Sequence, residues 1–280
     1  PLILLGFVTA SLKSEDKVLN ISAIPDQNQE ILDRRFNLFS REIERELNVK
    51  VKYLPVVNYV AAVTSFRTKN LDVVWFGGLT GVQARLQTPN SLVLAQRDID
   101  KKFQSVFIIN KKLELNSTME LNDLKYLKNY RFTFGSENST SGRLMPEYFL
   151  NKAGIKISDF KGKKAGFSGS HDATIALVNS GAFDAGVVNK QILERNLKYN
   201  RKRTKNINVF FISPDYSDYH WLAQGDLDKK FYKGFTSTLK KTILNFNKEN
   251  PSQREILKMF NANSFINADA SEYDNIELIG

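Results

Sequence analysis

Residues 135–142 read Gly135-Ser136-Glu137-Asn138-Ser139-Thr140-Ser141-Gly142, a small polar stretch between two apolar segments. The segment before it, 130–134, has the composition of a strand, and apolar residues at helical spacing follow it over 143–150. The stretch therefore predicts a strand, a loop and a helix start, with hydroxyl groups beside backbone N–H groups that have no partner within the helix. Such N–H groups, hydroxyl donors and the positive end of the helix dipole form an anion site. A hydroxyl-rich N-cap without a ligand explains the stretch alone equally well.

A second stretch, Gly166-Phe167-Ser168-Gly169-Ser170-His171-Asp172-Ala173, has the same pattern. It leads from an expected strand into a helix over 173–178 and carries one of only two histidines in the chain. A lone histidine is more often structural than functional, but this one lies at a second polar helix start. Two helix N-termini that face one cleft would bind a tetrahedral oxyanion without a metal ion. The pair of stretches therefore favours an anion site.

NSTSG at 138–142 and GSHDA at 169–173, in this order, resemble the periplasmic binding proteins of phosphonate and phosphite ABC transporters. The resemblance runs from near residue 20 to near residue 260. Further segments that carry it are AIPDQN at 23–28, Asn58-Tyr59 with Ala61-Ala62, DVVWFGG at 72–78, SVFIINK at 105–111 and SPDYSDY at 213–219. TGVQARLQTP at 80–89 also resembles a subgroup described as selenate-binding. The resemblance therefore implies an oxyanion ligand, but it indicates the identity of that oxyanion less strongly.

The composition excludes several classes of site. The chain has 280 residues and 42% hydrophobic content, enough for one large or two medium domains. It has no cysteine, which excludes disulfides, thiolate metal sites and cysteine nucleophiles, and two histidines leave little for a transition metal. The net charge of +10 is compatible with nucleic acid, an acidic membrane surface or anionic ligands. We interpret the dense basic run at 198–205 as a solvated loop, because no nucleic-acid-binding module accompanies it.

The first ten residues form an apolar run that ends in Val8-Thr9-Ala10. Small or light residues at these positions suit signal peptidase, and the run is too short to span a bilayer. We interpret residues 1–13 as a signal-peptide remnant and leader, which places the mature protein in the periplasm. A buried N-terminal strand is the alternative. The absence of a lipobox cysteine argues against a lipid anchor at this end.

Strands and helices alternate along the chain, which predicts an α/β fold with helices on the faces of the sheets. In the first part we expect strands at 18–24, 49–54, 71–76, 92–95 and 104–109, helices at 29–47 and 58–68, and a short helix after Gly77-Gly78. In the second part we expect strands at 131–134, 164–167, 183–187 and 208–212 and helices at 142–152, 172–180 and 189–199. Helical segments at about 227–247 and 252–260 complete the pattern.

The resemblance implies a two-lobed clamp, type II-like, in which each lobe is a mixed sheet flanked by helices. The chain would cross between the lobes at two hinges, near 104–110 and 208–214. Lobe 1 would comprise residues 14–107 and 214–280, and lobe 2 residues 108–213. Periodicity alone indicates only two α/β blocks. In such folds ligands bind at the carboxyl ends of strands, where loops enter helices.

The expected ligand-binding residues come from both lobes. They are Tyr59, Trp75, Phe76, Gly77, Ser139, Thr140, Ser141, His171, Asp218 and Tyr219. The hydroxyl groups and His171 would donate to oxyanion oxygens, and the charge of the His171 ring near neutral pH depends on its surroundings. Asp218 would accept from a protonated ligand oxygen, although a turn residue is an equally good interpretation. Trp75 and Phe76 would pack against a non-oxygen substituent, and the alternative is that they are ordinary core aromatics.

The sequence thus predicts a solute-binding protein of an ABC importer that captures a small phosphorus oxyanion such as phosphite or methylphosphonate. No acidic residue follows 183–188 before Glu194, which argues against aminoalkyl phosphonates. Another tetrahedral oxyanion, selenate or sulfate, is the alternative ligand. A serine hydrolase that uses Ser139 and His171 is a distant alternative, since the Gly-x-Ser-x-Gly elbow is missing. We expect a monomer that docks on a membrane permease, with no enzymatic activity, cofactor, metal or nucleic-acid partner.

Overall fold

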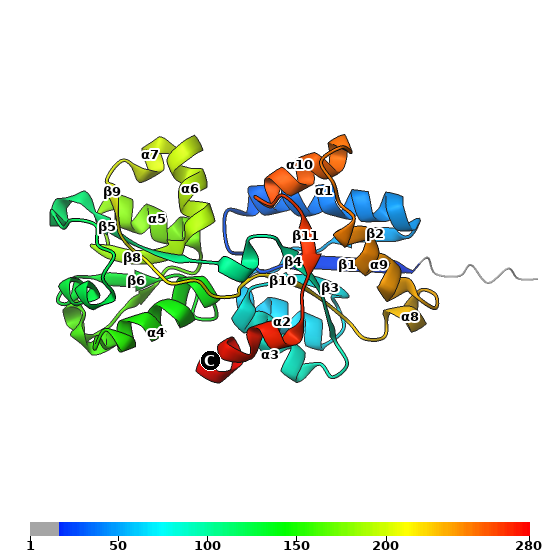
Figure 1. The fold of residues 1–280 in the computed structure, drawn as a ribbon, viewed down its shortest axis with the longest axis horizontal. Coiled ribbons are helices and arrows are strands. Elements are labelled where there is room, and N and C mark those ends of the chain that lie inside the picture. The colour runs from blue at the N-terminus through cyan, green and yellow to red at the C-terminus, as the bar shows by residue number, and fades with distance from the viewer. Residues whose placement is uncertain (1–16) are drawn as a thin grey trace, which may run out of the picture.

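The computed structural model describes residues 17–280, which fold into two α/β lobes side by side (Figure 1). The expected signal-peptide remnant at 1–13 lies outside the described residues. Within residues 17–280, none of the helices combines the length and the apolar character needed to cross a membrane.

The first lobe is built on a six-stranded mixed sheet with the strand order β11-β4-β10-β3-β1-β2. β1 pairs in parallel with β2 and β3, whereas β10 and β11 run antiparallel to their neighbours. The strands are β1 (Val18–Ala23), β2 (Lys50–Tyr53), β3 (Val73–Phe76), β4 (Leu92–Arg97), β10 (His220–Ala223) and β11 (Phe265–Asn267). The helices are α1 (Gln29–Leu47), α2 (Tyr59–Arg67), α3 (Gly78–Gln87), α8 (Leu227–Lys230), α9 (Phe235–Leu244), α10 (Pro251–Met259) and α11 (Asp274–Ile279).

The second lobe contains a five-stranded mixed sheet with the order β7-β6-β8-β5-β9. Its strands are β5 (Ser105–Asn110), β6 (Phe132–Phe134), β7 (Gly166–Phe167), β8 (Ala185–Asn189) and β9 (Ile207–Ile212). Its helices are α4 (Met145–Lys152), α5 (His171–Ser180), α6 (Lys190–Tyr199) and α7 (Arg201–Thr204), and a π-helical turn (Thr140–Leu144) precedes α4. The expected fold class, two mixed sheets flanked by helices, is confirmed.

The chain crosses between the lobes twice, and the two crossings lie against each other. Phe103 of the first crossing donates its N–H to the carbonyl of Tyr216 in the second at 2.9 Å, and Tyr216 N–H returns a bond to Phe103 at 3.0 Å. β5 pairs with β8 and β9 along its whole length, so the first crossing precedes Ser105, slightly before the expected boundary at 107/108. The hinge is therefore a hydrogen-bonded pair of chain segments.

The amphipathic helix expected over 29–47 is confirmed as α1. Its apolar residues at three- and four-residue spacing are buried against the sheet: Leu32, Phe36, Phe39, Ile43 and Leu47. Phe39 stacks on Trp221 of β10 with a centroid distance of 4.5 Å. Asn28 caps the helix, because its side chain accepts from the N–H of Glu30 at 2.9 Å. This packing fixes the start of α1 at the edge that faces the second lobe (Figure 1).

Three segments differ from expectation. The long helical segment at 227–247 is interrupted at Gly234, which has a φ of 86°, and the Asp228 carboxylate accepts from its N–H at 2.7 Å. Positive φ favours glycine, so the helix ends and restarts there. The basic run at 198–205 is exposed, as expected of a solvated segment, but Arg201–Thr204 form the short helix α7. β10 was not expected, because its four residues are all buried and show no alternation.

The ring of His220, the first residue of β10, packs directly against Gly81 of α3. The His220 Nδ1–H donates to the carbonyl of Asp218 at 3.3 Å. A Cβ atom at position 81 would lie 2.2 Å from ring atoms of His220, closer than any real contact. The sequence therefore needs glycine here for space.

We expect Gly81→Ala to lower the free energy of unfolding by about 1–3 kcal/mol, because the ring of His220 must move or the helix must shift. Urea denaturation measures this. The double variant Gly81→Ala/His220→Ala is the control: relative to His220→Ala alone, the extra methyl group should cost nothing or stabilise, as alanine favours helix. Equal stability of Gly81→Ala and the wild-type protein would contradict this account.

Candidate functional site

The hydroxyl-rich stretch forms a buried helix start in the second lobe. Ser139 is the cap of the π-helical turn, and its hydroxyl accepts from the N–H of Gly142 at 2.9 Å. Ser139, Thr140 and Ser141 are each at most 3% exposed. Ser105 donates its hydroxyl to the carbonyl of Ser141 at 2.8 Å, which ties this start to β5. Three hydroxyl groups are therefore held rigidly in a place that bulk water scarcely reaches.

The start of α3 in the first lobe faces this turn. The N–H of Gly78 donates to Asp218 Oδ1 at 2.9 Å, and the N–H of Leu79 donates across the lobe boundary to Thr140 Oγ1 at 2.9 Å. A Cβ atom at Gly77 would lie 3.2 Å from Asp218 Oδ1 and 3.3 Å from Thr140 Oγ1. The absence of a side chain at Gly77 thus lets the two lobes approach.

His171, the first residue of α5, presents a neutral ring to the same place. The backbone N–H of Asn189 donates to its Nδ1 at 3.2 Å, so in the neutral ring the proton is on Nε2. Nε2 lies 3.5 Å from the hydroxyl of Ser141. Burial lowers the pKa of His171 below its usual value, with Asp26 and Asp172 acting in the opposite direction. His171 is therefore a neutral donor near pH 7.

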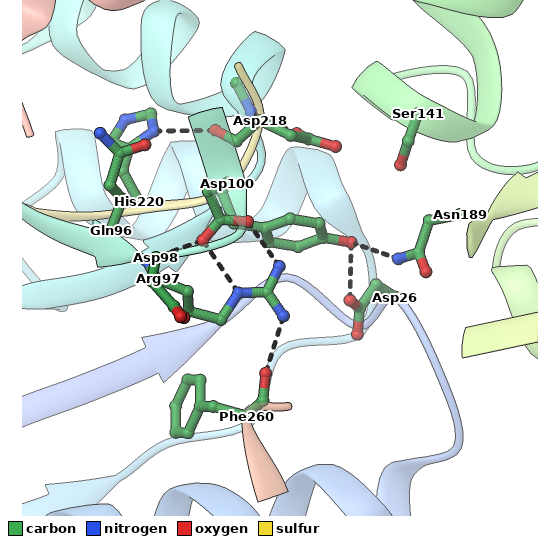
Figure 2. A network of polar contacts seen from close by, with 12 residues as sticks. Asp26, Gln96, Arg97, Asp98, Asp100, Ser141, Asn189, Asp218, His220 and Phe260 are labelled. Atoms are coloured by element: carbon green, nitrogen blue, oxygen red, sulfur yellow. Dashed lines mark hydrogen bonds and ion pairs between the residues drawn. The ribbon is translucent and has the colours of Figure 1, made fainter. Parts of the chain in front are cut away.

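Two buried polar atoms at this boundary have no hydrogen-bond partner of acceptable geometry among residues 17–280: the hydroxyl of Tyr59 and Oδ2 of Asp218. Both side chains are only 1% exposed. Buried polar groups are almost always paired, so an unpaired one indicates a missing partner. Tyr59 lies beside the Ser139 hydroxyl, and Asp218 beside those of Thr140 and Ser141. Figure 2 shows the Asp218 side chain extending toward Ser141.

Further bonds join the lobes around this point. The N–H of His171 donates to the carbonyl of Asp26 at 3.0 Å, and the N–H of Asn28 donates to Asp172 Oδ2 at 2.7 Å. Asn189 of the second lobe donates its amide to the hydroxyl of Tyr219 at 3.2 Å. The lobes are thus closed on each other around a cluster of buried polar groups, which we call the cleft: Tyr59, Gly77, Ser139, Thr140, Ser141, His171 and Asp218.

A buried cleft between two lobes, lined by neutral donors and one carboxylate, is the architecture of a solute-binding protein. The family described as "ABC transporter, phosphonate, periplasmic substrate-binding protein" matches residues 21–273. The chain belongs to this family.

Individual relatives agree with the family assignment. The chain is 66% identical over 278 residues to the "Probable ABC transporter phosphite binding protein PhnD1" of Prochlorococcus marinus strain MIT 9301, covering 99% of this chain and 94% of that protein. It is 28% identical to the "Phosphonates-binding periplasmic protein" of Escherichia coli K12 over 73% of this chain and 60% of that protein. The solved structure of Prochlorococcus marinus PhnD1 in complex with methylphosphonate superposes with a TM-score of 0.94 at 68% identity, covering 95% of this chain and 97% of that one.

Trp75 and Phe76, the two aromatic residues expected to contact the ligand, lie in different surroundings. Trp75 stacks on Tyr219 with a centroid distance of 5.7 Å and an interplanar angle of 16°. The hydroxyl of Tyr219 donates to Asp26 Oδ2 at 2.8 Å, so both rings form a wall beside the cleft. Phe76 is fully buried and packs edge-on against Phe66, which matches its interpretation as a core aromatic.

The sequence interpretation did not include several residues that shape the site. Asp26 and Asn189 bond to Tyr219 from opposite lobes (Figure 2). Asp26 lies shortly after the end of β1, and Asn189 is the last residue of β8; such strand ends are the signal that could have identified them. The buried ion pair Arg97–Asp100, at 2.6 Å, was also missed. The Arg97 guanidinium carbon lies 5.0 Å from the centroid of the Tyr219 ring and packs against the face of that ring.

The arrangement does not assemble the hydrolase triad that we considered. The His171 ring contacts Ser141 and the N–H of Asn189, while the Ser139 hydroxyl caps its own turn. The Asp172 carboxylate bonds to the N–H of Asn28 and to the side chain of Asn196, away from the ring. Ser139 therefore has no base positioned to activate it.

Asp218 gives the cleft a testable pH dependence. Burial raises its pKa from 3.8 to about 7, against the opposing effect of the Gly78 N–H, and the charge of Asp100 raises it further. A carboxyl group with a raised folded-state pKa contributes stability at low pH that is lost as the pH rises from about 4 through about 7.

We expect the free energy of unfolding of Asp218→Asn, relative to the wild-type protein, to rise by about 1–4 kcal/mol between pH 4 and pH 8, because the amide never carries the buried charge. Urea denaturation of the ligand-free protein at both pH values measures this. Asp215→Asn, on the exposed part of the same segment, is the matched control. A difference that stays constant with pH would show that Asp218 is not protonated in the folded state.

Proposed function

We propose that this protein captures a small phosphorus oxyanion, phosphite or methylphosphonate, in the cleft and delivers it to the permease of an ABC importer. The observation that carries the proposal is the pair of buried, unpaired polar atoms, Tyr59 Oη and Asp218 Oδ2, beside the hydroxyl-rich helix start. The phosphite-binding name of the 66% identical relative and the methylphosphonate complex of the 68% identical structure support it.

In this proposal the oxyanion oxygens accept from neutral donors. Ser139, Thr140 and Ser141 provide hydroxyl groups and backbone N–H groups from one helix start, and His171 provides its Nε2–H. Tyr59 provides its phenol hydroxyl from the opposite lobe. Because every one of these donors is a neutral group, recognition depends on the number and direction of hydrogen bonds rather than on a fixed counter-charge.

Asp218 determines which anions the cleft accepts. A carboxylate repels an anion unless a proton lies between them, carried either by the ligand or by Asp218, whose pKa of about 7 permits both. Phosphite and phosphonates protonate readily, whereas sulfate and selenate do not, so Asp218 favours the phosphorus oxyanions. Phosphate can carry the proton but has a fourth oxygen, which would be left unpaired against an apolar wall at a penalty of about 1–3 kcal/mol.

The proposal extends to the setting of the protein. It acts in the periplasm as a monomeric binding protein without enzymatic activity and docks on a membrane permease in its closed form. The two lobes rotate about the paired crossings at Phe103 and Tyr216. The first lobe comprises residues 14–107 and 214–280 and the second residues 108–213, except that all of β5 belongs to the second lobe. Ligand drives closure because only the closed form offers donors from both lobes.

Isothermal titration calorimetry in an amine buffer free of oxyanions tests the ligand. We expect phosphite and methylphosphonate to bind one per chain and at least about tenfold more tightly than phosphate, sulfate or selenate. Tighter binding of selenate or sulfate would agree with a two-lobed binding protein but contradict the assignment of a phosphorus oxyanion as its ligand. Much tighter binding of 2-aminoethylphosphonate would contradict the small-ligand assignment.

The unpaired hydroxyl of Tyr59 provides a test of the site. Tyr59→Phe should weaken phosphite binding by about 5- to 100-fold, the loss of one buried hydrogen bond. The ligand-free variant should be as stable as the wild-type protein or more stable, because the removed hydroxyl has no partner in the closed lobes. Tyr53→Phe, whose hydroxyl accepts from Gln29 outside the cleft, is the matched control. Unchanged affinity in Tyr59→Phe would remove Tyr59 from the site.

A further inference from the structure

A compartment lies between the lobes, next to the cleft but separate from it. It is a groove of about 720 Å³ lined by α1 and the segment after α10 from the first lobe and by α6 from the second. Its lining includes Asp26, Asn189 and Tyr219 but not Tyr59 or Asp218. The Tyr219 hydroxyl donates to Asp26 at 2.8 Å and accepts from Asn189 at 3.2 Å, so these three lining residues bond to one another across the lobe boundary (Figure 2).

Arg35 of α1 is a buried cation in this groove with incomplete pairing. It is 6% exposed, its Nε has no hydrogen-bond partner, and no carboxylate within residues 17–280 bonds to it. Turning the Gln27 amide allows its oxygen to accept from Nη1 and Nη2 at 3.2 and 3.0 Å. Burial lowers the pKa of Arg35 to about 10, and the effect of Asp26 only partly offsets this. Buried charges are normally paired, and within the described residues Arg35 has no directly bonded counter-ion.

Arg195 of α6 faces Arg35 from the other lobe. It is half-buried, and no hydrogen bond or ion pair joins it to another residue of the described chain. Its charge contributes to the lowered pKa of Arg35, which means that the two guanidinium groups repel each other across the lobe boundary. Closure of the lobes brings these like charges together. An anion between them would attract both guanidinium groups, and this attraction would outweigh their mutual repulsion.

The acidic residues of the groove do not fill this role. The charge of Asp26 partly offsets that of Arg35, but no hydrogen bond joins the two side chains, and Asp26 accepts from Tyr219 instead. Glu255 pairs with Arg34 at 3.4 Å. Glu30 and Glu194 are exposed at the rim. Ile31 and Met259 provide apolar surface in the lining. The Phe260 ring is fully buried, and its centroid lies 5.3 Å from the Arg35 guanidinium carbon.

We propose that this groove binds an organic anion whose carboxylate lies between Arg35 and Arg195 and whose apolar body packs on Ile31 and Met259. The planar guanidinium group presents paired donors that match a carboxylate. A volume of about 720 Å³ suits an organic molecule rather than an inorganic ion. Because the two arginines belong to different lobes, this anion binds the closed form and stabilises it.

Benzoate is the probe, with acetate as the head group alone and benzamide as the uncharged isostere. Titration of the full chain, saturated with methylphosphonate, should show one benzoate per chain with a Kd below about 1 mM. Acetate should bind more weakly, and benzamide should not bind. Arg195→Gln should weaken benzoate at least about tenfold, whereas Lys202→Gln, the same loss of charge on α7 outside the groove, should not. Arg35→Gln should act like Arg195→Gln if it folds.

The coupling to closure has its own readout. Saturating benzoate should tighten methylphosphonate at least about threefold in the wild-type protein, and methylphosphonate should tighten benzoate by the same factor, as linkage requires. This coupling should vanish in Arg195→Gln. If methylphosphonate itself fails to bind, the difference in benzoate affinity between wild type and Arg195→Gln still tests the groove. Benzoate binding weaker than about 10 mM, unchanged in Arg195→Gln, or matched by benzamide, would overturn the proposal.

Discussion

The burial of one carboxylate, that of Asp218, is the constraint around which the cleft is organised. Its removal from water is tolerated because the N–H of Gly78 donates to one oxygen and a proton is available to the other. The guanidinium of Arg97 is already neutralised by Asp100 and also donates to the carbonyl of Phe260. Within residues 17–280 no cation forms an ion pair with Asp218 and its second oxygen has no hydrogen-bond partner, so Oδ2 is available to a ligand.

This arrangement separates charge from recognition. The chain has a net charge of +10, yet the cleft contains hydroxyl groups, backbone N–H groups and a neutral His171 rather than arginine or lysine. A fixed cation would bind any anion of suitable size, whereas neutral donors stabilise only an anion whose oxygens lie in position to accept their hydrogen bonds. The cations near the lobe boundary act elsewhere: Arg97 supports the Tyr219 wall, and Arg35 and Arg195 line the groove beyond it.

Local sequence patterns were sufficient to predict the main elements, and together with the family resemblance they indicated the residues that the structure brings together in the cleft. Ser139 and His171 could be predicted because hydroxyl and imidazole groups at polar helix starts have a direct physical meaning. Asp26 and Asn189 lie at strand ends, but their bonds to Tyr219 could not be predicted, since these depend on which strand ends meet across the lobes. β10 was missed because a strand buried on both faces has no alternation. Phe76 was left open between two roles because adjacent strand residues point to opposite faces, and sequence does not tell which face Trp75 takes.

Closure also follows from the helix starts. The first N–H groups of a helix have no partner within it, and here those of Leu79 and His171 bond across the lobe boundary, to Thr140 Oγ1 and to the carbonyl of Asp26. Water satisfies the same groups when the lobes separate, so each such bond contributes only about 1 kcal/mol to closure. A ligand that pairs the remaining atoms of Tyr59 and Asp218 has differential affinity for the closed form, and this difference is sufficient to shift the population.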